Sequence, residues 1–293
     1  MLLMQQGATR RLNSDPKSWQ LRPRFFESGG RPIYGLCCEP TRKDLKPAAV
    51  VACHSYGPEQ AVGSRMIALA VREAAAIGFT AVAYHARGHG DSAGDLADVT
   101  FETMVHDALC AADQITAERG PIKIIWLGLR FGALVAAAAA ARRGAQAIVL
   151  WEPVHTGAGY FAELIRSLRF SEIIRRKQSG MTIAHAIEQL ESNGHIDLLG
   201  SYLHGKFYND ARNIRLADLM NGWCGPTFLA QIQPRMTLLP DNKALATELE
   251  RRGAIVNTLM VREEPGWYFP TWLHSWTDPH LLATTGAWLD AVA

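Results

Sequence analysis

Residues 123–141 read KIIWLGLRFGALVAAAAAA, and this stretch decides the fold. The apolar run at 124–127 is typical of a strand that is buried on both faces. The alanine-rich half that follows is a strong helix former with little side-chain bulk. Gly128 and Gly132 lie on either side of Arg130 and permit a turn too tight for side chains. The stretch therefore predicts a buried strand, a sharp turn and a helix.

The remainder of the chain alternates between buried strands and amphipathic helices. A hairpin is expected over 25–39 around Gly29-Gly30. Further strands are expected at 48–54, 79–85, 146–152, 226–232 and 254–261, and helices at 64–77, 100–118 and 279–291. This alternation of strands and helices predicts an α/β fold with a mostly parallel central sheet and helices on both faces.

The alternation of strands and helices stops between residues 154 and 221, where apolar side chains recur at helical spacing and no buried strand is evident. We interpret this range as an inserted helical lid. Residues 1–24 are polar and read as a lead-in, which leaves 25–153 and 222–293 as the core.

Composition excludes several classes of protein. The 293 residues are 48% hydrophobic with a formal net charge of +2, which argues against a general nucleic-acid binder. No apolar run is long enough to predict membrane insertion, and the first residues lack the apolar core of a secretory signal. The five cysteines are odd in number and include the neighbours Cys37 and Cys38, so we expect a reduced, cytoplasmic protein.

Ligands of such sheets bind outside the carboxyl ends of the strands. Four loops are expected at that edge: His54–Glu59, His85–Ser92, Leu129–Phe131 and Glu152–Gly157. Any functional site should lie among them.

Three segments carry a family resemblance: CHSYG at 53–57, RGHGDSAG at 87–94 and the Gly128–Gly132 turn. With them the chain resembles the α/β-hydrolases over nearly its whole length. The turn corresponds to the nucleophile elbow, in which a serine occupies the position of Arg130. The chain also resembles the exosortase A system-associated hydrolases of the second type, through GLRFGA at 128–133, SRM at 64–66 and LWEPV at 150–154.

Arg130 cannot act as a nucleophile, because its guanidinium stays protonated. It also precedes a helix whose N-terminus is already electropositive, so a negative partner is needed. Glu152, which ends the next strand, is the nearest candidate, and an anionic ligand is the alternative. The residue then forms either a structural ion pair or a bidentate site for a carboxylate or phosphate.

The resemblance implies roles for further residues. His54, Ser55 and Tyr56 stand in the oxyanion loop, where backbone N–H groups could form an anion cradle with that of Phe131. His274 fits the position of the catalytic histidine better than His280 does. The acid is expected near 231–241, where Gln231 and Gln233 occupy its usual place and Asp241 comes late. His274 could equally be packed among the tryptophans of 267–276.

Other reactive side chains are weaker candidates. Ser92 lacks an exposed turn, and the loop that holds His85 and His89 is expected to support the fold without a metal ion. Cys53 and Cys224 are expected to be packed thiols.

Two functions remain open. The first is a hydrolase or acyl-transfer enzyme for an ester, thioester or amide, with water or another residue replacing the serine. The second is a non-catalytic protein that binds a small acyl or anionic ligand, or a partner enzyme. A homodimer is a further alternative. We expect no cofactor and no metal ion.

Overall fold

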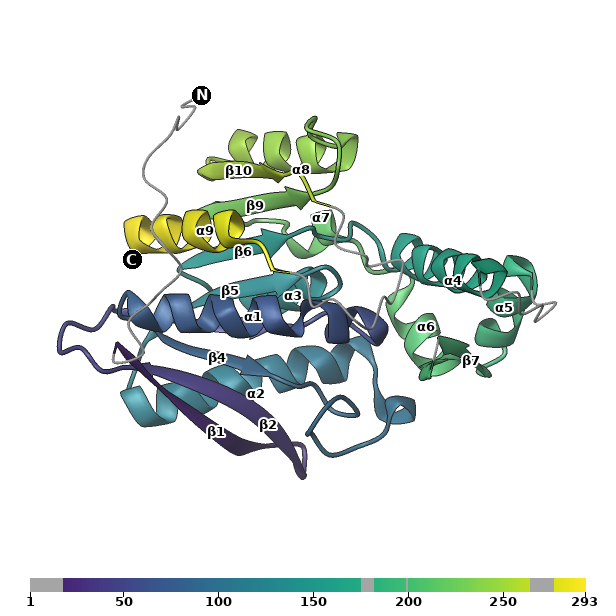
Figure 1. The fold of residues 1–293 in the computed structure, drawn as a ribbon, viewed down its shortest axis with the longest axis horizontal. Coiled ribbons are helices and arrows are strands. Elements are labelled where there is room, and N and C mark those ends of the chain that lie inside the picture. Colours follow the sequence, from purple (N-terminus) through teal and green to yellow (C-terminus); the bar gives the residue numbers. More distant parts are fainter. Residues whose placement is uncertain (1–17, 175–181, 199, 264–276) are drawn as a thin grey trace.

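The computed structural model describes residues 18–174, 182–198, 200–263 and 277–293. These residues form an eight-stranded sheet in the order β1-β2-β4-β3-β5-β6-β9-β10 (Figure 1). The strands are β1 Trp19–Ser28, β2 Arg31–Pro40, β3 Ala48–Cys53, β4 Thr80–Tyr84, β5 Lys123–Leu129, β6 Ala147–Trp151, β9 Thr227–Ile232 and β10 Val256–Val261. Strand β2 is antiparallel to β1 and β4, and the strands from β4 to β10 are mutually parallel.

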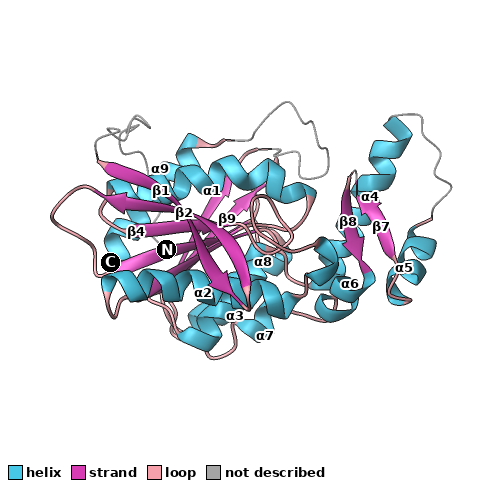
Figure 2. Cartoon of the chain, turned by 90° about the horizontal axis from the view of Figure 1, so that it is seen from below, coloured by secondary structure: helices cyan, strands magenta, loops and turns pink. Residues whose placement is uncertain are grey.

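Helices cover both faces of the sheet, as the sequence predicts (Figure 2). On one face lie α1 Pro58–Ala76 and α9 Pro279–Val292, and on the other lie α2 Phe101–Arg119, α3 Gly132–Arg143 and α8 Pro240–Arg251. The inner strands β3, β4 and β6 are buried throughout, because each is covered by helices on both sides. A short 3-10 helix, η1 Leu96–Asp98, follows the loop after β4.

The chain between β6 and β9 leaves the main sheet, and we call residues 154–221 the insertion. It contains α4 Gly157–Ile174, α5 Ile183–Glu191, β7 His195–Leu198, β8 Ser201–His204, α6 Gly205–Ala211 and α7 Leu216–Leu219. Most of these elements extend beyond one end of the core, with α7 lying back against it (Figure 1). The all-helical expectation was wrong in one respect, since β7 and β8 pair as an antiparallel hairpin. The strands are too short for their pattern to reveal them.

Strand β5 lies between β3 and β6, as expected from residues 124–127 and their neighbours. Several element bounds differ from the sequence-based ones, and one helix was missed. Strand β1 begins at Trp19, inside the expected lead-in, because its backbone pairs with β2 as far as Trp19 opposite Pro40. Helix α8 was not predicted; its mean hydropathy is low, and Leu245 and Leu249 are its main apolar anchors.

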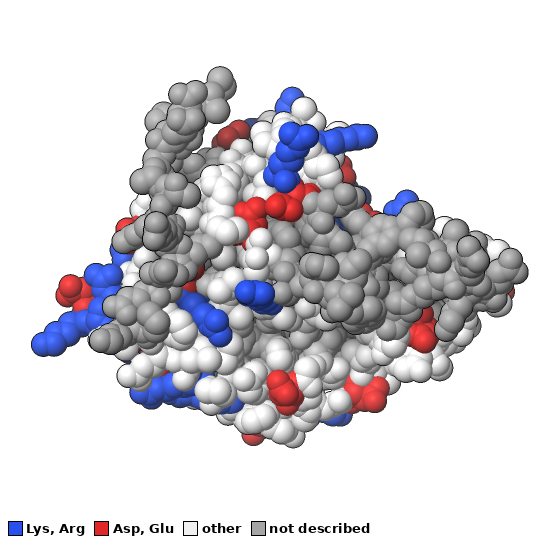
Figure 3. All heavy atoms as spheres, viewed as in Figure 1, with Lys and Arg blue, Asp and Glu red and all other residues white. Residues whose placement is uncertain are grey.

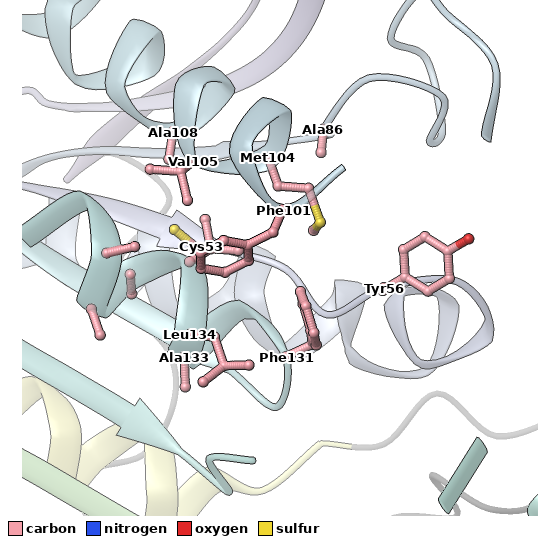
Figure 4. Close-up of a cluster of buried hydrophobic side chains, with 14 of the residues drawn as sticks. Cys53, Tyr56, Ala86, Phe101, Met104, Val105, Ala108, Phe131, Ala133 and Leu134 are labelled. Atoms are coloured by element: carbon pink, nitrogen blue, oxygen red, sulfur yellow. The ribbon is translucent and has the colours of Figure 1, made fainter. Parts of the chain in front are cut away.

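Helix α3 packs unusually close to the sheet because its inner face is glycine and alanine. A Cβ atom on Gly132 would lie 2.2 Å from the carbonyl oxygen of Cys53, so only glycine permits this approach. Beyond this contact the core mixes aliphatic and aromatic side chains, and Figure 4 shows Phe101 and Phe131 in one buried cluster with Cys53. The tight packing fixes the position of the turn before α3.

The Lys, Arg, Asp and Glu side chains of the described residues are interspersed on the face seen in Figure 3. No helix in the described ranges is long and apolar enough to cross a membrane.

Candidate functional site at the turn after strand β5

Arg130 lies between β5 and α3 with a φ of 53°, a conformation that is costly for any residue with a Cβ atom. Two backbone hydrogen bonds hold it there. The N–H of Arg130 donates to Trp151 O at 2.9 Å, and the N–H of Ala133 donates to Arg130 O at 3.0 Å. The expected strand, sharp turn and helix are therefore present, with Arg130 at the bend.

The Arg130 side chain is buried, with 3% of the residue exposed, and two carboxylates contact it. Its Nη2 lies 3.1 Å from Glu59 Oε1 and 2.6 Å from Glu163 Oε2, and its Nε donates to Glu59 Oε1 at 3.3 Å. The ring of Tyr160 lies 5.9 Å from the guanidinium carbon. Glu59 opens α1 in the core and Glu163 belongs to α4, so the guanidinium joins the core to the insertion.

The expected pairing of Arg130 with Glu152 requires correction. Glu152 is buried with a φ of 41°, and its carboxylate accepts hydrogen bonds from the backbone N–H of Ile232 and from Gln233 Nε2, the latter at 2.6 Å. It therefore fastens the end of β6 to the end of β9. Burial raises the pKa of Glu152, and these hydrogen bonds and the positive charge of Arg130 only partly oppose that rise.

The Ser55 hydroxyl lies at the centre of the same network. It donates to Glu59 Oε2 at 2.6 Å and lies 3.3 Å from the hydroxyl of Tyr160. The backbone N–H of Phe131 donates to it at 3.4 Å. That N–H directly follows the residue at the bend, so the amide expected to stabilise an oxyanion contacts a side chain of the protein itself.

Tyr160 and Tyr56 extend the network into the insertion. The Tyr160 hydroxyl donates to Tyr56 O at 3.2 Å, and the Tyr56 hydroxyl donates to Tyr202 O at 2.8 Å. Burial raises the pKa of Tyr56 and that of Tyr160 well above the ordinary tyrosine value, so both stay protonated donors. Phe131 packs against Tyr160 at 5.0 Å between ring centroids and against Phe207 at 5.3 Å.

His54 is buried beside this network. Burial lowers its pKa to about 3, with smaller contributions from His85 and His89, so the ring is neutral at physiological pH. Its ring lies 5.7 Å from that of His85, and its Nδ1 has no hydrogen-bond partner among the described residues. The side chain therefore braces the loop by packing, with no hydrogen bond at Nδ1.

The loop after β4 supports the fold. The Ser92 hydroxyl donates to His85 O at 2.5 Å and accepts from Tyr34 N at 2.8 Å. His89 accepts from Gly57 N at 3.3 Å, which ties this loop to the one after β3. Across the described ranges, no group of three or more His, Cys, Asp or Glu side chains is arranged to hold a metal ion.

The two cysteines differ from each other. Cys53 is buried, and burial raises the pKa of its thiol to about 12, as expected of a packed side chain. Cys224 is exposed, so its expected packing was wrong. It lies in the loop before β9.

The structure does not bring the expected acid to the turn. Asp241 is an exposed residue in the first turn of α8. Gln231 accepts from the backbone N–H of Leu239 at 2.6 Å and from Asn242 Nδ2 at 3.1 Å, so it fastens the start of α8. His274, with the aromatic residues of 267–276, lies outside the described residues.

The sequence reasoning missed the partners of Arg130. By topology Glu59 was as good a candidate partner as Glu152, because the chain that follows β3 lies at the same edge of the sheet as Arg130. Glu163 lies one helical turn after Tyr160, which places both on one face of α4. Nothing in the sequence shows which way that face turns.

Comparisons with known proteins agree with this fold. The family described as serine aminopeptidase, S33, matches residues 46–193, just over half of the chain. No curated protein sequence matches significantly.

Several solved esterases have similar structures. Est1E from Butyrivibrio proteoclasticus is 13% identical with a TM-score of 0.61, covering 92% of this chain and 98% of its own. The esterase Pf2001 from Pyrococcus furiosus is 14% identical with a TM-score of 0.60, covering 98% and 96%. Brefeldin A esterase, a bacterial homologue of human hormone-sensitive lipase, is 18% identical with a TM-score of 0.58, covering 97% and 79%. At these identities the likeness concerns the fold, and together with the family match it shows that this chain is an α/β-hydrolase of the serine aminopeptidase S33 family.

Proposed function

We propose that this protein is a hydrolase-family protein that binds a small acyl ligand beneath its insertion without serine-type catalysis. In this proposal Arg130 replaces the nucleophile and the insertion serves as a lid. The observation that carries the proposal is the buried contact of Arg130 with Glu59 and Glu163. The GLRFGA segment at 128–133 also supports the proposal that the chain belongs with the exosortase A system-associated hydrolases of the second type.

The chemistry at the turn supports the loss of serine catalysis. A guanidinium stays protonated and cannot attack a carbonyl carbon. The Phe131 N–H that would stabilise an oxyanion already contacts Ser55. A substrate carbonyl would have to displace that hydroxyl before it could use the amide.

The charges at the turn favour a neutral ligand over an anion. Arg130 contributes one positive charge, whereas Glu59 and Glu163 both lie within ion-pair distance of it. An additional carboxylate or phosphate would meet two like charges, which is unfavourable at this depth. The side chains between insertion and core are largely aromatic, including Phe131, Tyr160 and Phe207, and they favour an apolar acyl chain.

Ser55 supports a second candidate, which is hydrolysis or acyl transfer through an unusual nucleophile. Its hydroxyl lies 2.6 Å from Glu59 Oε2, within the range expected between a nucleophile and a general base. Two observations weigh against this candidate. Ser55 is 1% exposed, and Glu59 is also paired with Arg130.

Covalent labelling distinguishes the two candidates. The full chain is incubated with a fluorophosphonate and its intact mass is measured, beside Ser55→Ala and Ser92→Ala. We expect no adduct on any of the three proteins. A stoichiometric adduct that disappears in Ser55→Ala would overturn the proposal and establish the second candidate. An adduct that disappears in Ser92→Ala would overturn both.

Ligand class is tested with methyl octanoate and octanoate, which differ in charge but share the acyl chain. Tryptophan fluorescence of the full chain is titrated with each compound, and ester cleavage is followed by gas chromatography. We expect the ester to bind at least tenfold more tightly than the anion and to remain intact. Tighter binding of octanoate would show that Arg130 recognises anions, and failure of both to bind would remove the ligand-binding proposal.

A further inference from the structure

The hairpin β7–β8 of the insertion carries two facing histidines. His195 and His204 are direct cross-strand partners. One residue further out, the N–H of Gly205 donates to Gly194 O at 2.6 Å, which makes Gly194 and Gly205 the hydrogen-bonded pair. The histidines next to them form a non-hydrogen-bonded pair, the type in which Cβ atoms approach most closely. Their ring centroids are 5.4 Å apart and the ring planes are inclined by 37°.

Both rings lie on the outward face of the hairpin. Ile196, Leu198 and Leu203 are buried on the opposite face, and they fix which side of each strand points outward. His195 is exposed and His204 is half-buried. Within the described part of the chain, neither ring forms a hydrogen bond, so their nitrogen lone pairs are available to an external ligand.

The surroundings of His204 favour its neutral imidazole, which is the form that coordinates metals. Burial and the neighbouring His195 lower the pKa of His204, and Asp95 only partly opposes this. The ring of Tyr202 lies 5.3 Å from that of His195 and limits its movement.

From this pairing we propose that His195 and His204 form a site for a divalent transition-metal ion of the copper, nickel or zinc class. Imidazole nitrogen suits these ions and does not suit magnesium or calcium, which prefer oxygen. Water fills the remaining coordination positions. The site is independent of the turn at Arg130, and it departs from the expectation, drawn from the sequence, that the protein holds no metal.

A bound ion would clamp the two strands of the hairpin. Strand β8 contains Tyr202, whose carbonyl oxygen accepts the hydrogen bond from Tyr56 in the loop after β3. Metal binding would therefore stiffen the part of the insertion that contacts the core beside Ser55.

Calorimetric titration of the full, tag-free chain tests the proposal with copper, nickel, zinc and magnesium chlorides. We expect one site that binds copper most tightly and shows no heat with magnesium. His195→Ala and His204→Ala should each weaken zinc binding at least tenfold. The matched control is His185→Ala on α5, an exposed histidine of the insertion that should leave the affinity unchanged.

Electron paramagnetic resonance of the copper-loaded protein gives a second measurement that does not depend on affinity. The proposal predicts coupling to two imidazole nitrogens, reduced to one in either hairpin variant. Circular dichroism of each variant shows whether it is folded, and His195→Gln and His204→Gln replace any alanine variant that is not. Zinc binding that persists in both hairpin variants, or no binding at millimolar zinc, would overturn the proposal.

Discussion

Arg130 Nη2 lies 2.6 Å from Glu163 Oε2, and this contact joins the turn after β5 to helix α4 of the insertion. The arginine is almost fully buried, whereas about a third of the glutamate side chain is exposed (34%). The core therefore holds Arg130 in place, whereas Glu163 is exposed enough for water to replace the arginine as its partner. This asymmetry makes Glu163 the partner through which the insertion could separate from the core.

Glu163→Gln should loosen the insertion without unfolding the core. Solvent screening limits the loss of stability to about 1 kcal/mol or less. Hydrogen exchange of the α4 amides should become several-fold faster, while exchange of β5 stays unchanged. Glu188→Gln, on the exposed side of α5, is the matched control and should alter neither. Equal acceleration in both variants would show that the contact with Arg130 does not hold the insertion.

Arg130 and Glu59 should behave as a coupled buried pair. Arg130→Ala leaves the Glu59 carboxylate buried without its ion-pair partner and should cost about 3 to 5 kcal/mol in urea unfolding. Glu59→Ala should cost less, because Arg130 keeps its contact with Glu163. The double variant should lose less than the sum of the two single losses. Glu248→Ala, which breaks exposed pairs with Arg251 and Arg252, is the control and should have little effect on stability.

The same cycle separates Glu59 from Glu152. Because Glu152 is bonded to Ile232 and Gln233, its removal should add nearly independently to the loss of Arg130. Strong coupling between Arg130 and Glu152, with none between Arg130 and Glu59, would restore the pairing expected from the sequence.

The contrast between these two glutamates shows what the sequence can decide. Apolar runs and the glycines around Arg130 predicted the strand, turn and helix, because backbone geometry and burial leave those residues one arrangement. They also predicted that the arginine needs a negative partner. They could not select the partner, because three carboxylates reach the same edge and the choice depends on side-chain directions set by tertiary packing.

The insertion shows a second limit. Its helices follow from apolar spacing, but β7 and β8 have four residues each, too few for a two-residue period to be recognised. The pair His195 and His204 exists only because the hairpin sets their register. Residues nine positions apart in sequence carry no signal of contact on their own.

Acid should destabilise the fold through its buried histidines. The pKa of His54 is lowered to about 3 and that of His89 to about 4, mainly by burial. The unfolded chain binds protons at these sites from about pH 6.5 downward, while the folded chain does not. The contribution of these two histidines to the free energy of unfolding is therefore fully present above pH 6.5. It is lost as the pH falls from 6.5 to about 3.

Urea unfolding from pH 7.5 to 4.5 measures this loss, which amounts to about 1.4 kcal/mol for each pKa unit. The raised pKa of Glu152 acts in the opposite direction, because there the folded state binds the extra proton above the unfolded value of 4.5. His89→Gln should flatten the pH dependence. A profile that is unchanged by this substitution would mean that His89 is not held neutral in the fold.

Gly132→Ala should be among the most damaging single-methyl additions in the chain. A Cβ atom there would lie 2.2 Å from Cys53 O and 2.6 Å from His54 O, both backbone atoms that cannot move without displacing β3. Helix α3 would have to shift, and with it Arg130 and its contact with Glu59. We expect a loss of about 3 kcal/mol in urea unfolding, the upper range for overpacking. Gly286→Ala in α9 is the matched control, since no atom of the described residues lies within 4 Å of its added Cβ. The substitution should stabilise the helix by about 0.5 to 1 kcal/mol. If Gly132→Ala proves as harmless as the control, α3 does not pack against β3 as closely as the turn at Arg130 requires.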